Sequence, residues 1–218
     1  MPATDIPVAA TVVILRDGVS GPEVLMIERP DRGSFAGAWV FPGGKVDPGD
    51  ARRTAEETAR AAAVRETREE TGLRVAAEDL VLFALWDPPP DRPLRIRTWF
   101  FLVAHPGGRL ALAADEAVDA VWARPADLLE RHARGELRLY PPTWVTLHEL
   151  AERQDAADAL AVPRISGPRH YESVARTGPD GSLLLWREDA EYDAAGAAGT
   201  ARHRLDVSHL PWVYTRAD

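Results

Sequence analysis

The segment Arg65-Glu66-Thr67-Arg68-Glu69-Glu70-Thr71-Gly72-Leu73 gathers three carboxylates in one short stretch of chain. Residues three and four apart are neighbours on a helix, so Glu66, Glu69 and Glu70 are expected on one face, and Gly72 suits the left-handed position after a helix end. Like charges this close repel each other. The face is therefore either solvated and relieved by nearby arginines, or neutralised by a bound cation. Carboxylate oxygens suit Mg²⁺ or Mn²⁺, so the segment indicates a candidate metal site.

A glycine turn precedes this segment. The residues Phe41-Pro42-Gly43-Gly44-Lys45 are typical of a strand end followed by a tight turn. Gly43 and Gly44 have no side chains, which lets a phosphate approach the backbone amides. Lys45 is the only lysine in the chain, and it is either a phosphate contact or a solvated loop residue. A glycine turn, a helix and a carboxylate triplet together form one constellation.

This constellation resembles the signature of the Nudix hydrolases. The signature runs glycine, five residues, Glu, seven residues, and then Arg-Glu-aliphatic-any-Glu-Glu-any-Gly-aliphatic. Residues 65–73 match its second half, with Thr67 in the aliphatic position. The resemblance implies an α/β fold, a Nudix-type α/β/α sandwich with a mixed sheet. It also implies metal-dependent hydrolysis of a diphosphate linkage in a nucleoside diphosphate derivative, with Mg²⁺ or Mn²⁺ as cofactor.

The first half of the signature is out of register in this chain. Counting back from Arg65 without a gap places Glu57 at the first Glu of the signature. Aligning Gly44 with the signature's glycine places Asp50 there instead and requires an insertion before Arg65. We favour the second alignment, because it keeps the usual loop over residues 44–50 and leaves Thr54 and Glu57 as a helix capping box. Asp50 and Glu57 both remain candidates for the acidic position.

Segments outside the signature resemble one branch of the family, the peroxisomal coenzyme A diphosphatases and their bacterial relatives. The similarity runs through residues 25–29, 35–41, 86–88, 97–101 and 139–143. It implies coenzyme A or acyl-coenzyme A as the candidate substrate. The chain has no clear match to the separate motif expected of dedicated coenzyme A enzymes.

The resemblance also implies roles for individual residues. Glu66, Glu69 and Glu70 are the expected metal ligands, and Arg65 is expected to orient Glu69 and balance the charge. Glu69 or the loop residue Glu116 is expected to take the proton of the attacking water, and in relatives an acidic residue at the place of Glu116 often completes the metal site instead. The residues expected to contact substrate are Gly43, Gly44, Lys45, Arg29, Arg97 and Tyr140. Solvation of Glu116 and pairing of Arg29 with a neighbouring carboxylate are the alternatives.

Composition narrows the class of protein. The 218 residues are 45% hydrophobic, which is enough for one domain with its own core. A net charge of −8 and a pI near 5.3 argue against binding to nucleic acids or anionic membranes. The absence of cysteine excludes disulfides and thiol nucleophiles. With no apolar run of membrane-spanning length and no N-terminal signal pattern, the sequence predicts a cytoplasmic protein.

The chain is expected to divide into two regions. Residues 1–160 are predicted to form the Nudix hydrolase domain, including a helix from about residue 141 to 154. Residues 161–218 are predicted to form a β-rich C-terminal extension, with short strands at 162–165, 182–186 and 202–207. The extension is expected to pack on the domain or on a second subunit, and a homodimer is the expected assembly.

Two other classes of Nudix-like protein compete with a hydrolase. An isopentenyl diphosphate isomerase uses a cysteine, which this chain lacks. A non-catalytic nucleotide-sensing regulator usually has lost carboxylates or carries an added DNA-binding domain, whereas here the triplet is complete. We therefore expect an enzyme whose partner is a small-molecule diphosphate, with neither nucleic acid nor membrane as a partner.

Overall fold

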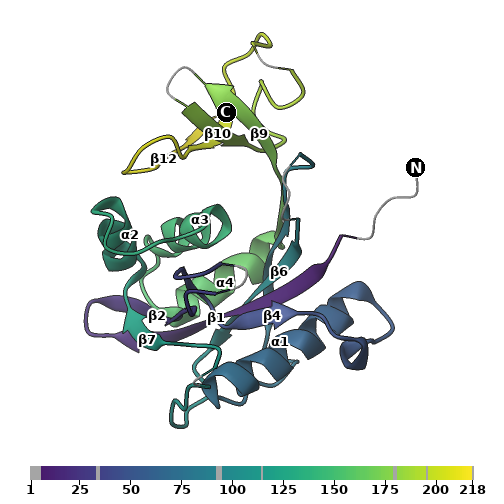
Figure 1. Cartoon of the computed structure of the whole chain (residues 1–218), viewed down its shortest axis with the longest axis vertical. Coiled ribbons are helices and arrows are strands. Elements are labelled where there is room, and N and C mark those ends of the chain that lie inside the picture. Colours follow the sequence, from purple (N-terminus) through teal and green to yellow (C-terminus); the bar gives the residue numbers. More distant parts are fainter. Residues whose placement is uncertain are drawn as a thin grey trace.

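A mixed sheet of eight strands forms the centre of the molecule (Figure 1). In chain order its strands are β1 (Val8–Gly18), β2 (Gly21–Glu28), β3 (Trp39–Val40), β4 (Gly43–Lys45), β5 (Val81–Asp87), β6 (Arg97–Ala104), β7 (Asp119–Ala123) and β8 (Arg169–Glu172). The sheet order is β3-β2-β1-β6-β5-β8, with β4 paired to β1 and β7 paired to β2. Strands β1 and β6 run parallel at its middle.

The structure is a computed structural model. It describes residues 6–32, 35–91, 95–113, 115–178, 181–194 and 196–217.

Strand β1 is buried on both faces. Val12, Val13, Ile14 and Leu15 are consecutive and fully buried, which explains why this run is continuously apolar rather than alternating. Its even-numbered and odd-numbered side chains belong to two different core clusters, one on each side of the sheet. A continuous apolar run in the sequence therefore corresponds to a strand covered by helices on both sides.

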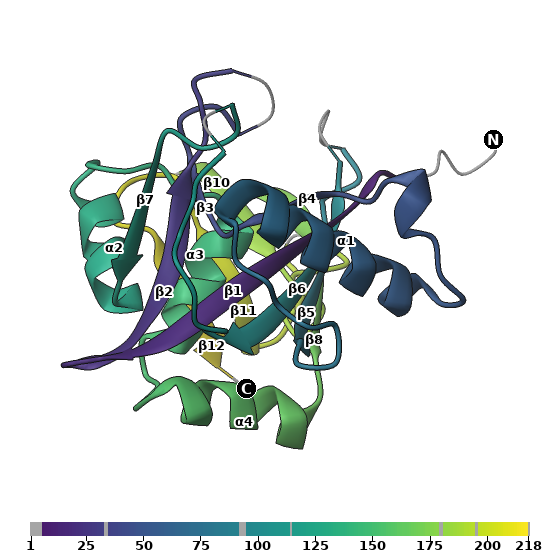
Figure 2. The same ribbon diagram turned by 90° about the horizontal axis from the view of Figure 1, so that it is seen from below.

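Helix α1 (Ala55–Thr71) covers one face of the sheet, and Figure 2 shows it in front of β1 and β6. The helix begins with a capping box, in which the Thr54 hydroxyl accepts from the Glu57 amide and the Glu57 carboxylate accepts from the Thr54 amide. Its buried apolar residues are small and pack on the sheet, and they are Ala59, Ala62 and Ala63. The small side chains bring the carboxylate-bearing end of α1 close to β4.

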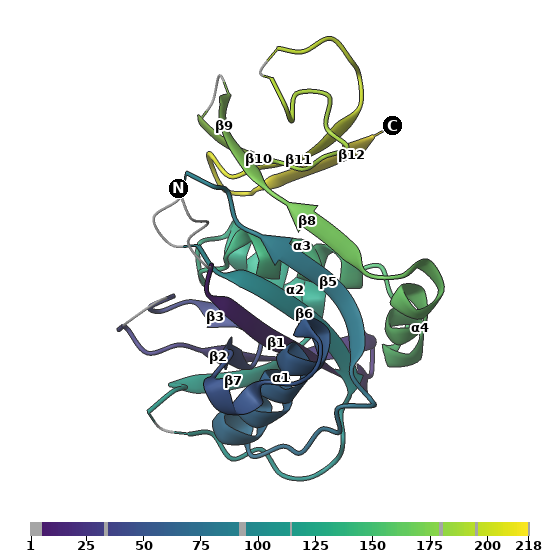
Figure 3. The ribbon, with the colours of Figure 1, turned by 90° about the vertical axis from the view of Figure 1, so that its right-hand side faces the viewer.

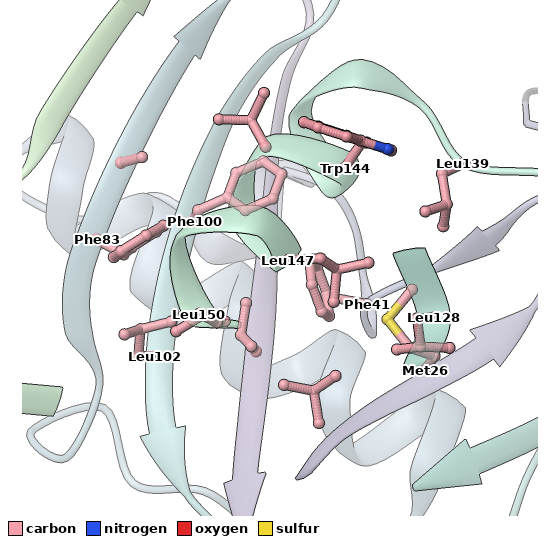
Figure 4. Close-up of a cluster of buried hydrophobic side chains, with 14 of the residues drawn as sticks. Met26, Phe41, Phe83, Phe100, Leu102, Leu128, Leu139, Trp144, Leu147 and Leu150 are labelled. Carbon is pink, nitrogen blue, oxygen red and sulfur yellow. The ribbon is translucent and has the colours of Figure 1, made fainter. Parts of the chain in front are cut away.

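Helices α2 (Pro125–Ala133), α3 (Pro141–Leu150) and α4 (Ala156–Ser166) cover the opposite face of the sheet (Figure 3). Figure 4 shows the core between these helices and the sheet, where Trp144 and Leu147 from α3 lie over Phe100 from β6 and Met26 from β2. Helix, sheet and helix thus form three layers. This layering confirms the predicted α/β/α sandwich with a mixed sheet.

The prediction of a strand at residues 162–165 is wrong, because these residues belong to α4. The Asp155 side chain caps this helix by accepting from the Asp158 amide. Its buried residues are Ala156, Ala159, Leu160 and Pro163, which follow the spacing of a helix face rather than the alternation of a strand. Helix α3 correspondingly ends at Leu150, earlier than the predicted residue 154.

The last part of the chain forms a second, four-stranded antiparallel sheet. Its strands are β9 (Val174–Gly178), β10 (Gly181–Leu185), β11 (Arg202–Asp206) and β12 (Val213–Ala217), in the order β12-β11-β10-β9. Strand β8 pairs in parallel with β5 of the main sheet and leads directly into β9 (Figure 3). The predicted boundary between residues 160 and 161 falls inside α4. In the ranges that the structure describes, no helix has both the length and the apolar character needed to cross a membrane.

Aromatic side chains join the second sheet to the main sheet. Trp86 of β5 stacks on Tyr171 of β8 with ring centroids 3.9 Å apart. Trp186, directly after β10, meets the edge of both rings, at 5.8 Å from Trp86 and 5.4 Å from Tyr171. All three side chains belong to the same core cluster as α3. The second sheet is therefore packed on the domain through a shared core.

Candidate functional site

The glycine turn lies where the chain has no room for side chains. Gly43 pairs with Thr11 of β1, and a Cβ atom at Gly43 would lie 2.4 Å from the Ala10 carbonyl oxygen. A Cβ atom at Gly44 would lie 2.3 Å from the carboxylate carbon of Glu66. Gly43 is therefore required by the neighbouring backbone and Gly44 by a functional side chain. A side chain is thus excluded at the two adjacent glycines for different reasons.

Arg65 is the centre of a network of ion pairs. Its guanidinium donates two hydrogen bonds to Asp50, at 3.1 and 2.8 Å. It also donates to Glu66 at 2.9 Å, to Glu69 at 3.0 Å and to the Lys45 carbonyl at 3.0 Å. These contacts raise the pKa of Arg65, and they lower the pKa of Asp50 because the guanidinium stabilises its carboxylate. Arg65 thus contacts Glu69, the residue that it is expected to orient.

The contacts of Arg65 also decide between Asp50 and Glu57. Asp50 is only 4% exposed, and its carboxylate lies between the arginine and the Asp47 amide at 2.8 Å. Glu57 instead forms the capping box with Thr54 at the start of α1. Asp50 is therefore the acidic partner of Arg65. The insertion after it is taken up by a short 3-10 turn (Pro48–Asp50) and the capped helix start.

Glu70 is fully buried, which is unusual for a carboxylate. The Gly43 amide donates to its Oε2 at 2.8 Å, and Arg29 Nη2 lies 2.5 Å from its Oε1. Burial nevertheless raises the pKa of Glu70 to about 7, with Glu66 and Glu116 adding to the rise. Arg29 also donates to the Gly43 carbonyl at 2.6 Å and to the Glu116 carbonyl at 3.4 Å. Arg29 thereby contacts the glycine turn, α1 and the loop before β7 at the same time.

Three carboxylates converge beside the glycine turn. Glu66, Glu70 and Glu116 each offer an oxygen atom, and these atoms lie within 4.8 Å of one another. Burial raises the pKa of Glu66, and the charge of Glu116 raises it further. We call Glu66, Glu70 and Glu116 the acidic cluster. Glu69 is not in this group, and its half-exposed carboxylate accepts from Arg65 at 3.0 Å.

A cavity of about 770 Å³ opens next to the acidic cluster. Arg29, Gly43, Gly44, Lys45 and Glu116 line it, as do several apolar side chains. Tyr140 lines it as well, and its ring meets the edge of Phe35 at 4.8 Å.

One predicted substrate residue lies elsewhere. Arg97 is absent from the cavity lining among the described residues, although its neighbours Ile96 and Thr98 are part of it. Its guanidinium pairs with Asp87 at 2.5 Å.

Sequence reasoning did not find every residue of the cavity. Leu184 and Val207 from the C-terminal extension line it, together with Ser173. No spacing or charge pattern marks these residues, because they reach the cavity only through the packing of the second sheet.

Comparison with known proteins places the chain in a family. The family model described as NUDIX domain matches residues 5–143. A CTP pyrophosphohydrolase from Escherichia coli (strain K12) is 31% identical over 118 residues, which are 54% of this chain and 76% of that protein. A Nudix hydrolase structure from Alicyclobacillus acidocaldarius has a TM-score of 0.64 and 28% identity, covering 72% of this chain and 96% of that one. A MutT Nudix hydrolase structure from Burkholderia pseudomallei has a TM-score of 0.51 and 25% identity, covering 66% and 97% of the two chains.

Nudix hydrolases act on nucleoside diphosphate derivatives and generally use divalent metal ions. The matched range includes the glycine turn, the acidic cluster and its arginine partners. The chain belongs to the Nudix family and is a Nudix hydrolase of the pyrophosphatase class.

Proposed function

We propose that this chain hydrolyses the diphosphate linkage of a nucleoside diphosphate derivative with Mg²⁺ or Mn²⁺ held by the acidic cluster. The observation that carries the proposal is the convergence of Glu66, Glu70 and Glu116 oxygens within 4.8 Å beside the cavity that the glycine turn lines. When bound, such a cation supplies positive charge to the diphosphate and makes water a better nucleophile.

The residues of the cluster fit a hard divalent cation. Their ligand atoms are all carboxylate oxygens, which Mg²⁺ and Mn²⁺ prefer. Glu70 is buried with a raised pKa, and Glu66 and Glu116 both contribute to that rise. A positive charge among the three carboxylates would relieve this repulsion. Glu69, which the sequence also suggested as a ligand, points to Arg65 instead.

The surrounding residues take different roles in this proposal. Arg29 and Lys45 line the cavity and neutralise the diphosphate. The Gly43 amide, which the sequence suggested as a phosphate contact, donates to Glu70 instead. Arg65 is a positioning residue, because it fixes Glu66 and Glu69 relative to each other. Glu69 accepts the proton of the attacking water, since it is the partly exposed carboxylate of the triplet and its orientation is held. The nucleoside monophosphate and a second phosphorylated group leave.

The identity of the second group is the finer part of the proposal. The size of the cavity, about 770 Å³, and its many apolar lining side chains favour a large and partly apolar group. Coenzyme A and acyl-coenzyme A meet this description and are the candidates that the sequence resemblance suggests. The expected homodimer stays a prediction.

The test is a turnover panel with Mg²⁺ and with Mn²⁺, in which the products are identified by mass. Coenzyme A, acyl-coenzyme A, NADH, ADP-ribose, nucleotide sugars, CTP and dNTPs are the substrates. Release of 3′,5′-ADP from coenzyme A supports the finer assignment, whereas a preference for CTP or dNTPs overturns it. Binding of these compounds without turnover of any of them would favour the alternative of a non-catalytic nucleotide sensor.

A further inference from the structure

The cavity beside the acidic cluster has two chemically different parts. Arg29, Lys45 and Glu116 line the part next to the glycine turn. A second part is lined by the apolar side chains of Trp86, Phe100, Leu184 and Val207, which we call the apolar compartment. The two parts belong to one cavity, which Phe41 and Phe100 both line with ring centroids 6.3 Å apart.

The C-terminal extension supplies one wall of this compartment. Leu184 lies on β10 and Val207 directly follows β11, and both pack on the main core cluster. The two segments are neighbours in the second sheet, where the Val207 amide donates to the Ser182 carbonyl at 3.0 Å. Both lie beyond residues 5–143, the range that matches the family model. This wall is therefore a feature added to the family domain.

The alternation of side chains along β10 explains why Leu184 reaches the cavity. Leu184 and Trp186 pack against the main core cluster, so the strand turns this face toward the domain. Leu183 and Leu185 point to the other side of the sheet, and neither lines the cavity among the described residues. Leu183 is consequently a matched control for Leu184, with the same side chain on the opposite face.

Aromatic and hydrogen-bond contacts anchor this wall to the domain. Trp186 contacts Trp86 and Tyr171 in the shared aromatic core, and its indole nitrogen donates to the Ser173 hydroxyl at 3.0 Å. Ser173 and Trp86 also line the cavity. The residues that anchor the second sheet to the domain thus also line the cavity.

We propose that the second sheet is a specificity element, and that the apolar compartment receives an alkyl or acyl chain of the group attached to the diphosphate. The inference rests on the proposed function, because it takes the acidic cluster as the place of the diphosphate. Charge favours this arrangement, since the diphosphate belongs with Arg29 and Lys45. Asp87, which lines the cavity beside Trp86, is already paired with Arg97 and His170. An apolar chain would displace water from the side chains of Trp86, Phe100, Leu184 and Val207, which favours its binding there.

The test uses a series of nucleoside 5′-diphosphate alkyl esters, from methyl to hexyl, with the nucleoside kept constant. Dissociation constants are measured by calorimetry on analogues with a methylene bridge in place of the diphosphate oxygen, which bind without being cleaved. Each methylene that enters the compartment is expected to tighten binding about two- to fourfold, so hexyl binds at least about thirtyfold more tightly than methyl.

Variants at Leu184 locate the effect. Leu184→Phe fills part of the compartment, and we expect it to reduce the hexyl-to-methyl ratio of affinities at least about fivefold while leaving the methyl ester unchanged. Leu184→Gln, of similar length but polar, is the second variant and is expected to act in the same direction. Leu183→Phe is the control and keeps the wild-type ratio. Thermal unfolding confirms that each variant is folded.

The outcomes separate this inference from the function on which it rests. Equal affinities along the ester series would overturn it, as would an equal effect of Leu183→Phe and Leu184→Phe. A Leu184 variant that weakens the methyl and hexyl esters alike would also contradict it. Failure to hydrolyse any of the corresponding oxygen-bridged esters would instead count against the proposed function and leave the binding result to stand by itself.

Discussion

At the scale of single residues, Asp50 shows how one contact settles an ambiguity of alignment. Two carboxylates competed for the first acidic position of the signature, and sequence spacing alone favoured neither decisively. In the folded chain Asp50 receives two hydrogen bonds from Arg65, while Glu57 caps α1. The insertion can be inferred from the sequence, but which of the two carboxylates pairs with Arg65 depends on the path of the inserted loop.

Replacing Asp50 by asparagine is expected to destabilise the protein at pH 7 by about 1–3 kcal/mol, because a nearly buried charged pair with Arg65 is lost. Glu57→Gln is the control, since glutamine preserves the capping box, and should change stability by less than about 0.5 kcal/mol. Chemical denaturation measures both. Equal effects of the two substitutions would contradict the assignment of Asp50.

The ion pair between Asp50 and Arg65 should also make the stability of the protein depend on pH. Arg65 lowers the pKa of Asp50 in the folded protein below the ordinary aspartate value of 3.8. The stability from this group is therefore present above pH 3.8 and is lost as the pH falls through the lower, folded pKa. The stability difference between wild type and Asp50→Asn is expected to shrink as the pH falls below about 4. A difference that grows toward low pH would contradict this.

Glu116 belongs to the acidic cluster and Glu69 does not, although helix spacing predicts Glu69 beside Glu66 and Glu70. Helix spacing puts Glu69 with Glu66 and Glu70, but Arg65 holds its side chain, and Glu116 from a loop completes the cluster instead. Spacing fixes the face of a helix, whereas the direction of a long side chain depends on its partner.

Glu69→Gln should lower kcat by about 100-fold, the usual effect of removing a proton acceptor, and leave the metal concentration for half-maximal activity unchanged. Steady-state kinetics over a Mn²⁺ titration gives both values. Near-normal turnover would contradict the role of Glu69 as proton acceptor, and a large increase in the metal requirement would make it a ligand.

At the scale of elements, strand β4 combines a structural and a functional constraint in adjacent glycines. A Cβ atom at Gly43 would collide with β1 backbone, which cannot move without disturbing the sheet. A Cβ atom at Gly44 would meet only the end of the Glu66 side chain. The sequence identified the turn, but it could not separate these two demands because they depend on the approach of β1 and α1.

The two alanine substitutions should therefore have different effects. Gly43→Ala is expected to destabilise the protein by more than about 2 kcal/mol, as a backbone clash does. Gly44→Ala should change stability by less than about 1 kcal/mol but lower kcat at least about tenfold, because Glu66 is displaced. Denaturation and kinetics on both variants test this contrast. The reverse pattern would contradict it.

The incorrect strand at residues 162–165 has a similar cause. Its residues Val162-Pro163-Arg164-Ile165 suit an edge strand by local preference, and proline normally argues against a helix interior. The Asp155 cap and the burial of Ala156, Ala159 and Leu160 against the sheet outweigh that preference. Elements with long, regular patterns, such as β1, β6 and α1, were predictable, whereas this short one depends on tertiary packing.

At the scale of the whole molecule, the second sheet shares the core of the domain. Trp186 is almost fully buried between Trp86, Tyr171 and His203, with Leu205 in the same cluster. The domain and its extension are therefore expected to unfold together. The sequence predicted an extension rich in strands, but the cavity wall it builds depends on contacts between residues far apart in the chain.

Trp186→Ala should destabilise the molecule by about 3–5 kcal/mol, the usual effect of removing a large core aromatic side chain. Tryptophan fluorescence and far-ultraviolet circular dichroism should follow one common transition in the wild type. Val213→Ala, at an exposed position, is the control and should have little effect. A separate early transition of the second sheet would contradict a shared core.

The central claim is that the acidic cluster of Glu66, Glu70 and Glu116 binds the cation that diphosphate hydrolysis needs. The most direct measurement is a Mn²⁺ titration of turnover, on the best substrate of the panel, for wild type, Glu70→Gln, Glu116→Gln and the control Glu57→Gln. We predict no turnover without metal. We also predict at least a tenfold higher metal requirement or about a 100-fold loss of kcat in the two cluster variants, and wild-type behaviour in the control. Turnover that persists in excess chelator, or cluster variants that match Glu57→Gln, would contradict the claim.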